Sequence, residues 1–352
     1  MAARKGRGET NRRPPTMVDV ARHAAVSTAT VSYALSGKQE LLRRVGPDAK
    51  QRIAEAVQQL GYAHNKAARH LRLQKAERIC VLLPKLGIPF ADKIIRDFRA
   101  VAEARGHSII VVTGESLDVW RRVISEVEAG LADGLVADAD ILAEDDLKDL
   151  FRSTLRLTKP RLVLHPSAAP DNFSVVNYDR LDSLARALAH LRDTGHRRIA
   201  YIENLWHRRN ERSALVRETV GKRGSGMKLV AIVPGASTRE AAAAAVRALM
   251  AEPTRPNGIL VESDFAAVVV IEELQRGGLN VPTDVAVIGA GNAEEGYYTH
   301  PRLTTIGPTE MSFKEAAEHL MDQVAGPGEQ VFRRFVVPWA LIVRESTGSS
   351  PA

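Results

Sequence analysis

The sequence predicts a small all-α domain at the N-terminus, followed by a larger α/β domain built from two Rossmann-like subdomains. Three observations lead to this prediction. Positive charge is concentrated in the first fifth of the chain, three short amphipathic helices follow one another between residues 16 and 60, and from residue 79 onward apolar strands alternate with amphipathic helices. Alternation of the last kind is typical of parallel α/β sheets.

Length and composition limit the class of protein. The 352 residues are 45% hydrophobic and 26% charged, which indicates a soluble protein of two or three domains and excludes a chain disordered throughout. No run of 18 apolar residues occurs, and the basic N-terminus leads into Pro14 and Pro15, so we expect no membrane partner, no secretory signal and a cytoplasmic location. Cys80 is the one cysteine and stands in an apolar run, which indicates a buried strand rather than a disulfide.

Charge divides the chain unevenly. Residues 1–78 hold 16 Lys and Arg against 6 Asp and Glu, whereas residues 79–352 hold 33 against 36. A local surplus of Lys and Arg neutralises phosphates and releases their counterions, so the asymmetry favours a nucleic-acid-binding segment. Charge alone leaves a merely basic, soluble tail as an equal alternative.

Helix signals begin after residues 1–15, an arm too rich in Arg, Gly and Pro to bury an apolar core. Thr16 is a good N-cap for a first helix, with Asp19 three residues later as an approximate capping box. After a short break, Ser27 or Thr28 caps a second helix. The two helices around a tight turn predict a helix-turn-helix domain over residues 16–63.

The second and third helices are amphipathic. A third helix spans about residues 47–60 and ends at Gly61. On the second helix the period predicts Val31, Ala34 and Leu35 inward, and Thr28, Ala29, Ser32 and Tyr33 outward. Any small three-helix unit would show the same spacing, so the spacing alone leaves a purely structural role open. Residues 64–77 then connect this domain to the larger one.

The larger domain spans residues 78–346, before a tail at 347–352. We expect strands at 79–83, 107–112, 133–137, 161–164, 197–202, 229–233, 258–262 and 284–288. We expect helices near 90–105, 117–130, 143–155, 180–194, 208–221, 238–251 and 264–276. The chain should cross between the two subdomains near 165–175, 290 and 325, which leaves a cleft like that of periplasmic sugar-binding proteins, with a ligand at the carboxyl ends of the strands.

The pattern of the larger domain leaves two other functions to consider, those of an oxidoreductase and of a solute-binding protein. The run Gly289-Ala-Gly291 after a strand is superficially like the dinucleotide fingerprint of an oxidoreductase, but its third glycine, Gly296, comes late. The pattern contains no metal-ligand cluster, P-loop, or paired nucleophile and base, so we expect no enzyme, metal or cofactor. A solute-binding protein without DNA activity is the second rival, since the cleft domain alone would suit one.

Specific residues then decide between these readings. The segment from Thr16 to Gly37 closely resembles the N-terminal motif of LacI/GalR-family transcriptional regulators. The resemblance continues, in the family's order, through Leu60-Gly-Tyr62, Asn65, Ala67-Ala-Arg-His-Leu-Arg72, Ala132-Asp-Gly-Leu-Val136, Thr194-Gly-His-Arg-Arg-Ile-Ala-Tyr-Ile202, Val281-Pro-Thr-Asp-Val-Ala-Val-Ile-Gly289 and Pro301-Arg-Leu-Thr-Thr305. The sequence departs from the family at the helix-helix turn, where Ala25 replaces the usual glycine, and in a longer loop between Lys38 and Val45.

The resemblance implies roles for DNA-facing residues. Thr28 and Ala29 take the base-reading start of the second helix, and Tyr33 takes the third reading position. Leu71 takes the family's wedge position, where a leucine enters the minor groove and unstacks a base step. The short polar residues implied as phosphate contacts are Thr16, Ser27, Thr30, Ser32 and Asn65. The resemblance also implies a hinge helix and linker over residues 64–77, which contributes Arg69 and Arg72.

The resemblance also implies effector-binding residues in the cleft. Arg212 matches the family's ligand-contacting arginine and Asp264 the acid of its Asn-Asp pair. Asp179 matches another family acid, although its neighbour is Arg180 where the family has asparagine. Phe90 is left to stack on a ligand ring, and Gly291 and Asn292 stand where the family usually carries two aspartates, the first of which commonly holds sugar hydroxyls. A lost acid and a retained arginine favour an acidic or less hydroxylated ligand held by Arg212.

These residues together predict a DNA-binding transcriptional regulator and not an enzyme. We expect a repressor that binds a palindromic operator as a homodimer, with its DNA affinity changed by a small-molecule effector, sugar-like or an organic acid. Its place would be the cytoplasm, associated with the bacterial nucleoid. The absence of a leucine heptad after Ser346 favours a dimer over a tetramer.

Overall fold

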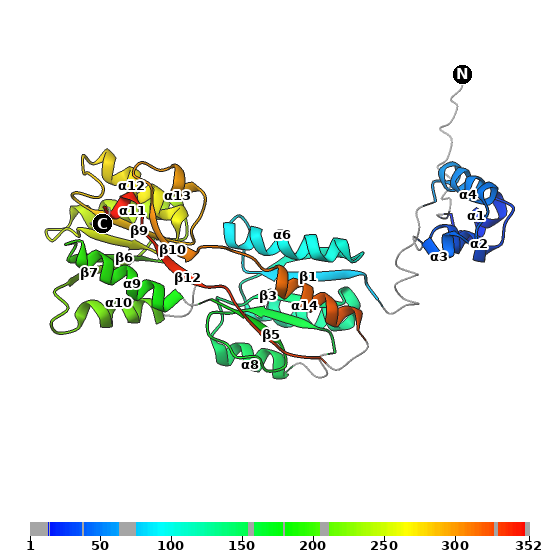
Figure 1. Ribbon diagram of the computed structural model, residues 1–352, viewed down its shortest axis with the longest axis horizontal. Coiled ribbons are helices and arrows are strands. Elements are labelled where there is room, and N and C mark those ends of the chain that lie inside the picture. Colours follow the sequence, from blue (N-terminus) through cyan, green and yellow to red (C-terminus); the bar gives the residue numbers. More distant parts are fainter. Residues whose placement is uncertain are drawn as a thin grey trace, which may run out of the picture. The chain divides into compact units, whose positions relative to one another are not determined.

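The computed structural model describes residues 13, 15–36, 39–62, 75–153, 158–178, 180–204, 211–326 and 330–348. Contacts within the chain divide it into two compact units, Met1–Gln74 and Lys75–Ala352 (Figure 1). Among the described residues, no helix is both long enough and apolar enough to cross a membrane.

The first unit is a small helical domain. Its helices are α1 (Met17–His23), α2 (Thr28–Ala34), α3 (Gln39–Leu42) and α4 (Pro47–Leu60). The predicted capping box forms: Asp19 N donates to the Thr16 hydroxyl at 3.4 Å, and the Thr16 amide donates to the Asp19 carboxylate at 2.8 Å. Ser27 is the cap of α2, since its hydroxyl accepts from the Thr30 amide at 3.1 Å. The extra residues of the long loop form α3, which the sequence did not predict.

A shared apolar core holds these helices together. Val20 of α1, Val31 of α2, and Ile53 and Ala56 of α4 are all buried in one cluster, as the helical period predicts. Gly61 ends α4 in the left-handed conformation at φ 61°, a backbone state that costs a glycine little.

The turn between α1 and α2 carries a strained residue. Ala25 lies at φ 50°, the conformation for which the family's usual glycine is suited. An L-residue pays roughly 1 kcal/mol or more in that region because its Cβ crowds the following carbonyl. The alanine at this turn therefore carries a strain that a glycine would not.

Ala25→Gly should raise the free energy of unfolding of the first unit by about 0.5–1 kcal/mol, because the relief of strain exceeds the added chain entropy. The neighbouring Ala24, at φ −81° and 2% exposed, supplies the matched control. Ala24→Gly should instead destabilise by about 1 kcal/mol. Urea unfolding of the two variants checks both signs, and a destabilised Ala25→Gly would contradict the strain.

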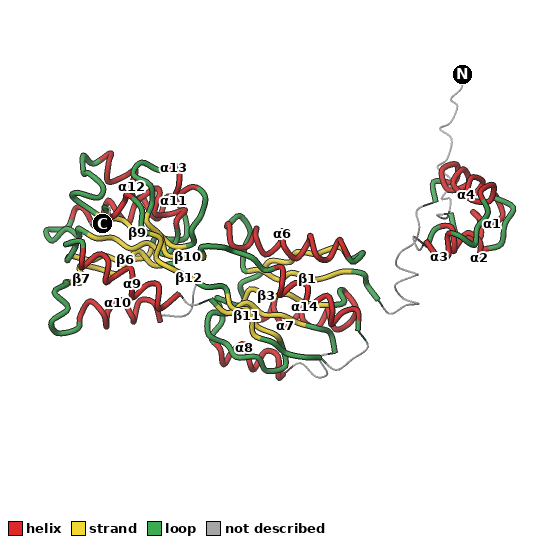
Figure 2. Tube along the Cα trace, in the orientation of Figure 1, coloured by secondary structure: helices red, strands yellow, loops and turns green. Residues whose placement is uncertain are grey.

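The second unit contains two six-stranded sheets, each covered by helices on both faces (Figures 1 and 2). The first sheet has the order β11-β5-β4-β3-β1-β2 and is parallel throughout. Its strands are β1 (Arg78–Leu83), β2 (Ser108–Thr113), β3 (Gly134–Asp138), β4 (Arg161–Leu164), β5 (Ser174–Asn177) and β11 (Arg334–Val336). Its helices are α6 (Pro89–Ala104), α7 (Leu117–Glu126), the π-helix η1 (Val127–Leu131), α8 (Glu144–Ser153) and α14 (Lys314–Ala325).

The second sheet has the order β12-β10-β9-β8-β6-β7, with only β12 antiparallel to its neighbour among the described strands. Its strands are β6 (Arg198–Glu203), β7 (Lys228–Pro234), β8 (Gly258–Val261), β9 (Ala286–Ala290), β10 (Thr304–Pro308) and β12 (Trp339–Ile342). Its helices are α9 (Arg180–Asp193), α10 (Glu211–Gly221), α11 (Arg239–Ala251), α12 (Asp264–Arg276), α13 (Glu295–Tyr298) and the 3-10 helix η2 (Glu345–Thr347).

Successive side chains of a strand point to opposite faces of the sheet, so the strands of each lobe contribute residues to two apolar cores. In β1, Val81 packs with α6 and α14 on one face, whereas Cys80 and Leu82 pack with α7 and α8 on the other. Cys80 is thus buried in a strand as predicted, and burial raises the pKa of its thiol to about 12. Because helices cover both faces of the sheet, both sets of side chains in such a strand are buried, and the strand is apolar along its whole length.

The predicted crossings between the lobes are only partly right. The chain leaves the first sheet between β5 and α9, close to the predicted 165–175. The second and third predictions, near 290 and 325, are wrong, because the chain returns between β10 and α14 and crosses again between β11 and β12. The error has a physical source. The unpredicted β10 extends the second sheet, and the unpredicted α14 and β11 then complete the first.

Candidate functional site

The exposed start of α2 is the first candidate site. Thr28 and Ala29 are exposed, whereas Val31 is fully buried. One face thus anchors the helix while its first residues stay open to a partner. Ser32 is partly exposed on the same helix.

Three hydroxyls assigned to phosphate contacts already make bonds inside the domain. Thr16 donates to Asp19 at 2.6 Å, and the Ser27 and Thr30 hydroxyls bond each other at 2.8 Å. The capping role is therefore present in the structure. A phosphate oxygen only accepts, so a contact needs a hydroxyl proton. The Ser27–Thr30 pair uses one of its two hydroxyl protons and keeps the other for a phosphate, whereas the Thr16 proton is already donated to Asp19.

Tyr33 departs from the outward position that the helical period predicts. It is half-buried and packs against the apolar core of the first unit. The reason is its size, since a large ring beside Val31 on a seven-residue helix reaches the core that a smaller side chain would miss. Part of the ring therefore supports the domain.

Several predicted residues lie outside the described part of the chain. These are Asn65, Arg69, Leu71 and Arg72 of the hinge segment, and Asp179 before α9. Gly37, the last residue of the segment that resembles the family's N-terminal motif, lies there too.

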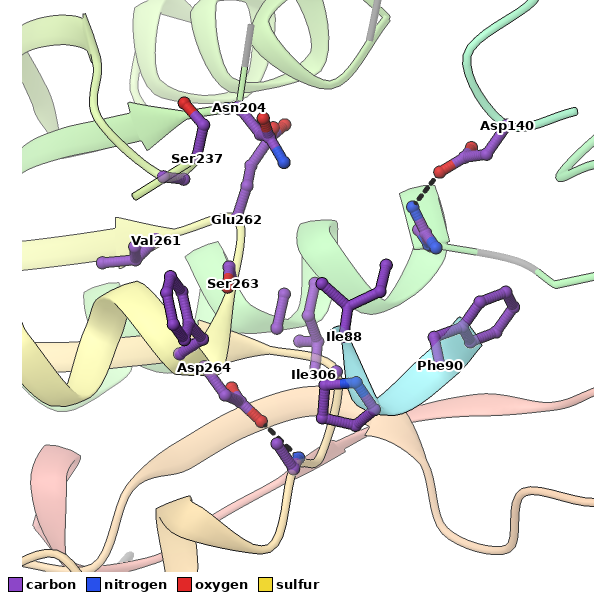
Figure 3. A pocket seen from close by; sticks show the side chains of 18 of the residues that line it. Ile88, Phe90, Asp140, Asn204, Ser237, Val261, Glu262, Ser263, Asp264 and Ile306 are labelled. Atoms are coloured by element: carbon purple, nitrogen blue, oxygen red, sulfur yellow. Dashed lines mark hydrogen bonds and ion pairs between the residues drawn. The ribbon is translucent and has the colours of Figure 1, made fainter. Parts of the chain in front are cut away.

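The second candidate site is a cavity of about 510 Å³ between the two lobes of the second unit. The carboxyl ends of parallel strands face it, as the α/β fold predicts. Figure 3 shows Glu262, Ser263 and Asp264 after β8 on one side, and Asp140, beyond β3, on the other. Ile88 and Phe90 at the start of α6 also line it.

Arg212 lines the cavity but its charge is already balanced. Its guanidinium lies 3.4 Å from the Glu262 carboxylate and 3.9 Å from that of Asp140, and its side chain is 14% exposed. Burial opposes the positive charge, but the two acids outweigh burial and raise the pKa of Arg212. Glu262 in turn accepts from the Tyr201 hydroxyl and, at 2.6 Å, from the Asn204 amide.

Arg180 forms a second buried pair that joins the lobes. Its guanidinium, on α9 of the second lobe, donates to Asp140 of the first at 2.5 Å (Figure 3). The same group lies 4.6 Å from the ring centre of Tyr178 and 4.7 Å from that of Trp339. A cation over two aromatic faces, paired with a carboxylate, is held firmly in place.

Asp138 ends β3 and also lines the cavity. It is 4% exposed and accepts the Asp140 amide at 3.4 Å. Burial first, and then the Asp140 charge, raise the pKa of Asp138 to about 7. The site therefore favours the protonated form of this carboxyl group more than an exposed position would.

Asp138→Asn should make stability depend less on pH. A carboxyl whose pKa is raised in the folded state stabilises the fold below pH 4, and this contribution is lost as the pH rises through about 7. The free energy of unfolding of the variant minus that of the wild type should be on the order of 2–4 kcal/mol higher at pH 8 than at pH 4. Thermal melts across pH 4–8 check this, with exposed Asp118→Asn as the control. An unchanged slope would contradict the shift.

Asp264 lines the cavity but its oxygens serve the fold. One accepts from the Thr305 hydroxyl at 2.6 Å, and the other from the Ala293 amide at 2.6 Å. Burial raises the pKa of Asp264 to about 6. A Cβ on Gly289 would lie 2.2 Å from this carboxylate, so the glycine is needed for the close approach.

The structure does not bring Asn292 to the cavity wall. Its amide donates to the Pro308 carbonyl at 2.8 Å and its oxygen accepts from Arg344 at 2.6 Å. Gly291, its neighbour, does line the cavity and offers no side chain there. Asn292 therefore supports the β9–β10 edge rather than a ligand.

Phe90 is placed at the cavity but already has aromatic partners. Its ring contacts Tyr178 and Phe313 edge-on, with centroids 5.4 Å apart in each case. One surface of the ring is thus packed into the first lobe, and what remains lines the cleft.

Sequence reasoning missed the acids and the second arginine that organise the cleft. Asp138 is the last residue of the buried strand β3, Asp140 lies two residues beyond it, and Glu262 follows the buried strand β8 directly. This place at the carboxyl end of a strand is the signal that could have found them. Arg180 was noticed only as a departure from the family. Its partner lies forty residues away, so spacing gave no hint of the pair.

Comparison with known protein families supports this two-part organisation. Residues 16–65 match the model described as bacterial regulatory proteins, lacI family, and residues 188–347 match a periplasmic binding protein-like domain. The transcriptional repressor CytR of Escherichia coli strain K12 is 27% identical over 96% of this chain and 97% of its own length. Catabolite control protein A of Priestia megaterium is 26% identical over 83% and 86%.

Solved structures show the same fold. The lac repressor dimer bound to operator and the anti-inducer ONPF aligns with a TM-score of 0.76 at 20% identity, covering 96% of this chain and all of that one. A complex of the transcriptional regulator CelR with cellobiose aligns with a TM-score of 0.63 at 25% identity, covering 94% and 99%. CytR is named as a transcriptional repressor and CelR as a transcriptional regulator. With its lacI-type helix-turn-helix unit and two-lobed cleft domain, this chain belongs to the lacI family of DNA-binding transcription regulators.

Proposed function

We propose that this protein represses transcription as a homodimer bound to a palindromic operator, and that a small molecule in the interlobe cleft changes its DNA affinity. The observation that carries the proposal is the joining of two features in one chain. Thr28 and Ala29 are exposed at the start of α2, a helix whose other face is buried in the first unit. The second unit has a cavity of about 510 Å³ between its two lobes. Such a protein acts in the cytoplasm, at the nucleoid.

A selection of DNA from a random pool tests the proposal. The full chain should enrich one palindromic sequence, since a symmetric dimer reads two identical half-sites. Exchanging Thr28 and Ala29 for other small residues should change the enriched sequence and leave the thermal stability nearly unchanged. If no sequence is enriched, the proposal that this protein regulates transcription is wrong. A solute-binding protein is then favoured, provided that the chain still binds a small molecule.

The cleft favours a different ligand class from the one that the sequence suggests. Arg212, expected to hold an acidic ligand, already faces two carboxylates. Among the described lining residues, four are cationic and five are acidic, so an anion gains no net attraction. We therefore propose a neutral, hydroxyl-bearing effector of the sugar-like class rather than an organic acid. A similar regulator binds a sugar, cellobiose, in its solved complex.

Asp138 is the acceptor best placed for such a ligand. Its carboxyl group lines the cavity, and Ser237 and Ser263 add hydroxyls across from it. Thermal-shift screening of a panel of neutral sugars and organic acids separates the two classes. A sugar should raise the melting temperature of the wild type and do so less in Asp138→Ala, whereas stabilisation by acids alone would overturn this assignment.

A further inference from the structure

The point where the chain enters the second unit is held by a buried carboxylate. Asp133 accepts the backbone N–H of Ala76 at 2.9 Å and that of Glu77 at 2.6 Å. We call these three residues the linker clamp. Glu77 lies at φ 54°, a conformation that a glutamate adopts only when its surroundings impose it. Two charge-assisted bonds to successive amides supply that constraint.

The Asp133 carboxylate makes its shorter contacts with these two amides. Asp133 is 6% exposed, and the Lys159 ammonium and the His107 ring each lie 3.8 Å away. The Asp133 amide also donates to the Arg78 carbonyl at 2.8 Å. The side chain and the backbone of Asp133 thus both hold the entering chain where β1 and β3 begin.

The clamp and the cleft lie at opposite ends of one strand. Asp133 immediately precedes β3, and Asp138 ends it in the cavity wall, with Asp140 two residues beyond. Every residue of β3 is buried between its neighbours β1 and β4. A strand of five residues spans roughly 16 Å, and one packed on all sides moves as a rigid piece rather than deforming.

We propose that β3 couples the effector cleft to the DNA-binding unit, with Asp133 as the positioning residue. A ligand that disturbs Asp138 or the Asp140–Arg180 pair displaces the cleft end of β3. The clamp passes that displacement to Ala76 and Glu77, from which the chain leads back to the first unit. This inference rests on the proposed effector-controlled DNA binding and specifies the path by which it works.

A double-mutant cycle on the full chain tests the coupling without an identified effector. Asp140→Asn breaks the interlobe pair and should change the affinity for the selected palindrome roughly tenfold. In an Asp133→Asn background the same change should shift affinity by less than about twofold, because the cleft end of β3 no longer drives the linker. An equal effect of Asp140→Asn in both backgrounds would overturn the proposal.

Asp97 provides the matched control. It is also a buried acid of the first lobe that holds a backbone amide, that of Phe313 at 2.8 Å, but it lies on α6 and away from β3. Asp97→Asn should lower the melting temperature yet leave the effect of Asp140→Asn on DNA affinity unchanged within about twofold. Loss of the coupling in this variant as well would show that Asp133 acts only through stability.

Hydrogen exchange covers the case in which Asp133→Asn does not fold. In the wild type the amides of Ala76 and Glu77 should be protected, and Asp140→Asn should speed their exchange by roughly tenfold. Unchanged protection contradicts the coupling. Failure of the wild type to select any DNA is a separate result, which removes the proposed function itself and this inference with it.

Discussion

Arg212→Ala should destabilise the second unit by about 3–5 kcal/mol, because it leaves buried acids without their balancing charge. Glu262, at 3.4 Å, is the acid most affected, and Asp140 at 3.9 Å loses part of its compensation. The same variant should lose the thermal response to any cleft ligand, since the side chain lines the cavity. Urea unfolding and thermal-shift assays measure the two effects.

Two further variants make the expectation about Arg212 specific. Arg217→Ala removes an exposed arginine from the same helix, α10, and should change stability by less than about 0.5 kcal/mol. Arg212→Met combined with Glu262→Gln removes both charges of the pair and should recover most of the lost stability. Simple addition of the two single effects would show that the pair is not the source of the loss.

DNA affinity should fall about a thousandfold or more between 50 and 200 mM salt, as expected for six or more phosphate contacts. The surplus of ten positive charges in residues 1–78 supplies such contacts, whereas residues 79–352 carry a slight negative balance. Affinity for the selected palindrome across a salt series gives the slope directly. A flat curve would contradict a phosphate-based interface.

The basic arm provides an internal comparison. Residues 1–14 contain five Lys and Arg, and removing them should make the slope of log affinity against log salt shallower by about 0.9 for each lost contact. The sequence preference should stay the same, because the base-reading positions Thr28 and Ala29 are untouched. A slope unchanged by the deletion would place all of the phosphate contacts in the helical domain.

How far the sequence predicted the structure depends on the range of the interaction. Helix caps such as Thr16 and Ser27, and the buried strand around Cys80, follow from local spacing and were found. Short strands such as β11, three residues long, and the helix α14 were missed. Their formation depends on a sheet whose other strands come from elsewhere in the chain, and three residues carry too little periodicity to show it.

The cleft shows the same limit more sharply. The sequence pointed to Arg212 and Asp264, and both line the cavity. It could not show that Arg212 is paired with Glu262 or that Asp264 is held by Thr305, since these partners are fifty and forty-one residues distant. The expected acidic ligand followed from treating Arg212 as a free charge. Only the three-dimensional arrangement shows which charges are already balanced.

We propose, above all, that one chain couples a cleft ligand to sequence-specific DNA binding. The most direct measurement is the affinity of the full chain for its selected palindrome, with and without a sugar that raises its melting temperature. We expect the DNA affinity to change by about 5- to 150-fold, and the palindrome must then change the affinity of the protein for that sugar by the same factor in the same direction. A sugar that stabilises the protein yet leaves DNA affinity unchanged would contradict it.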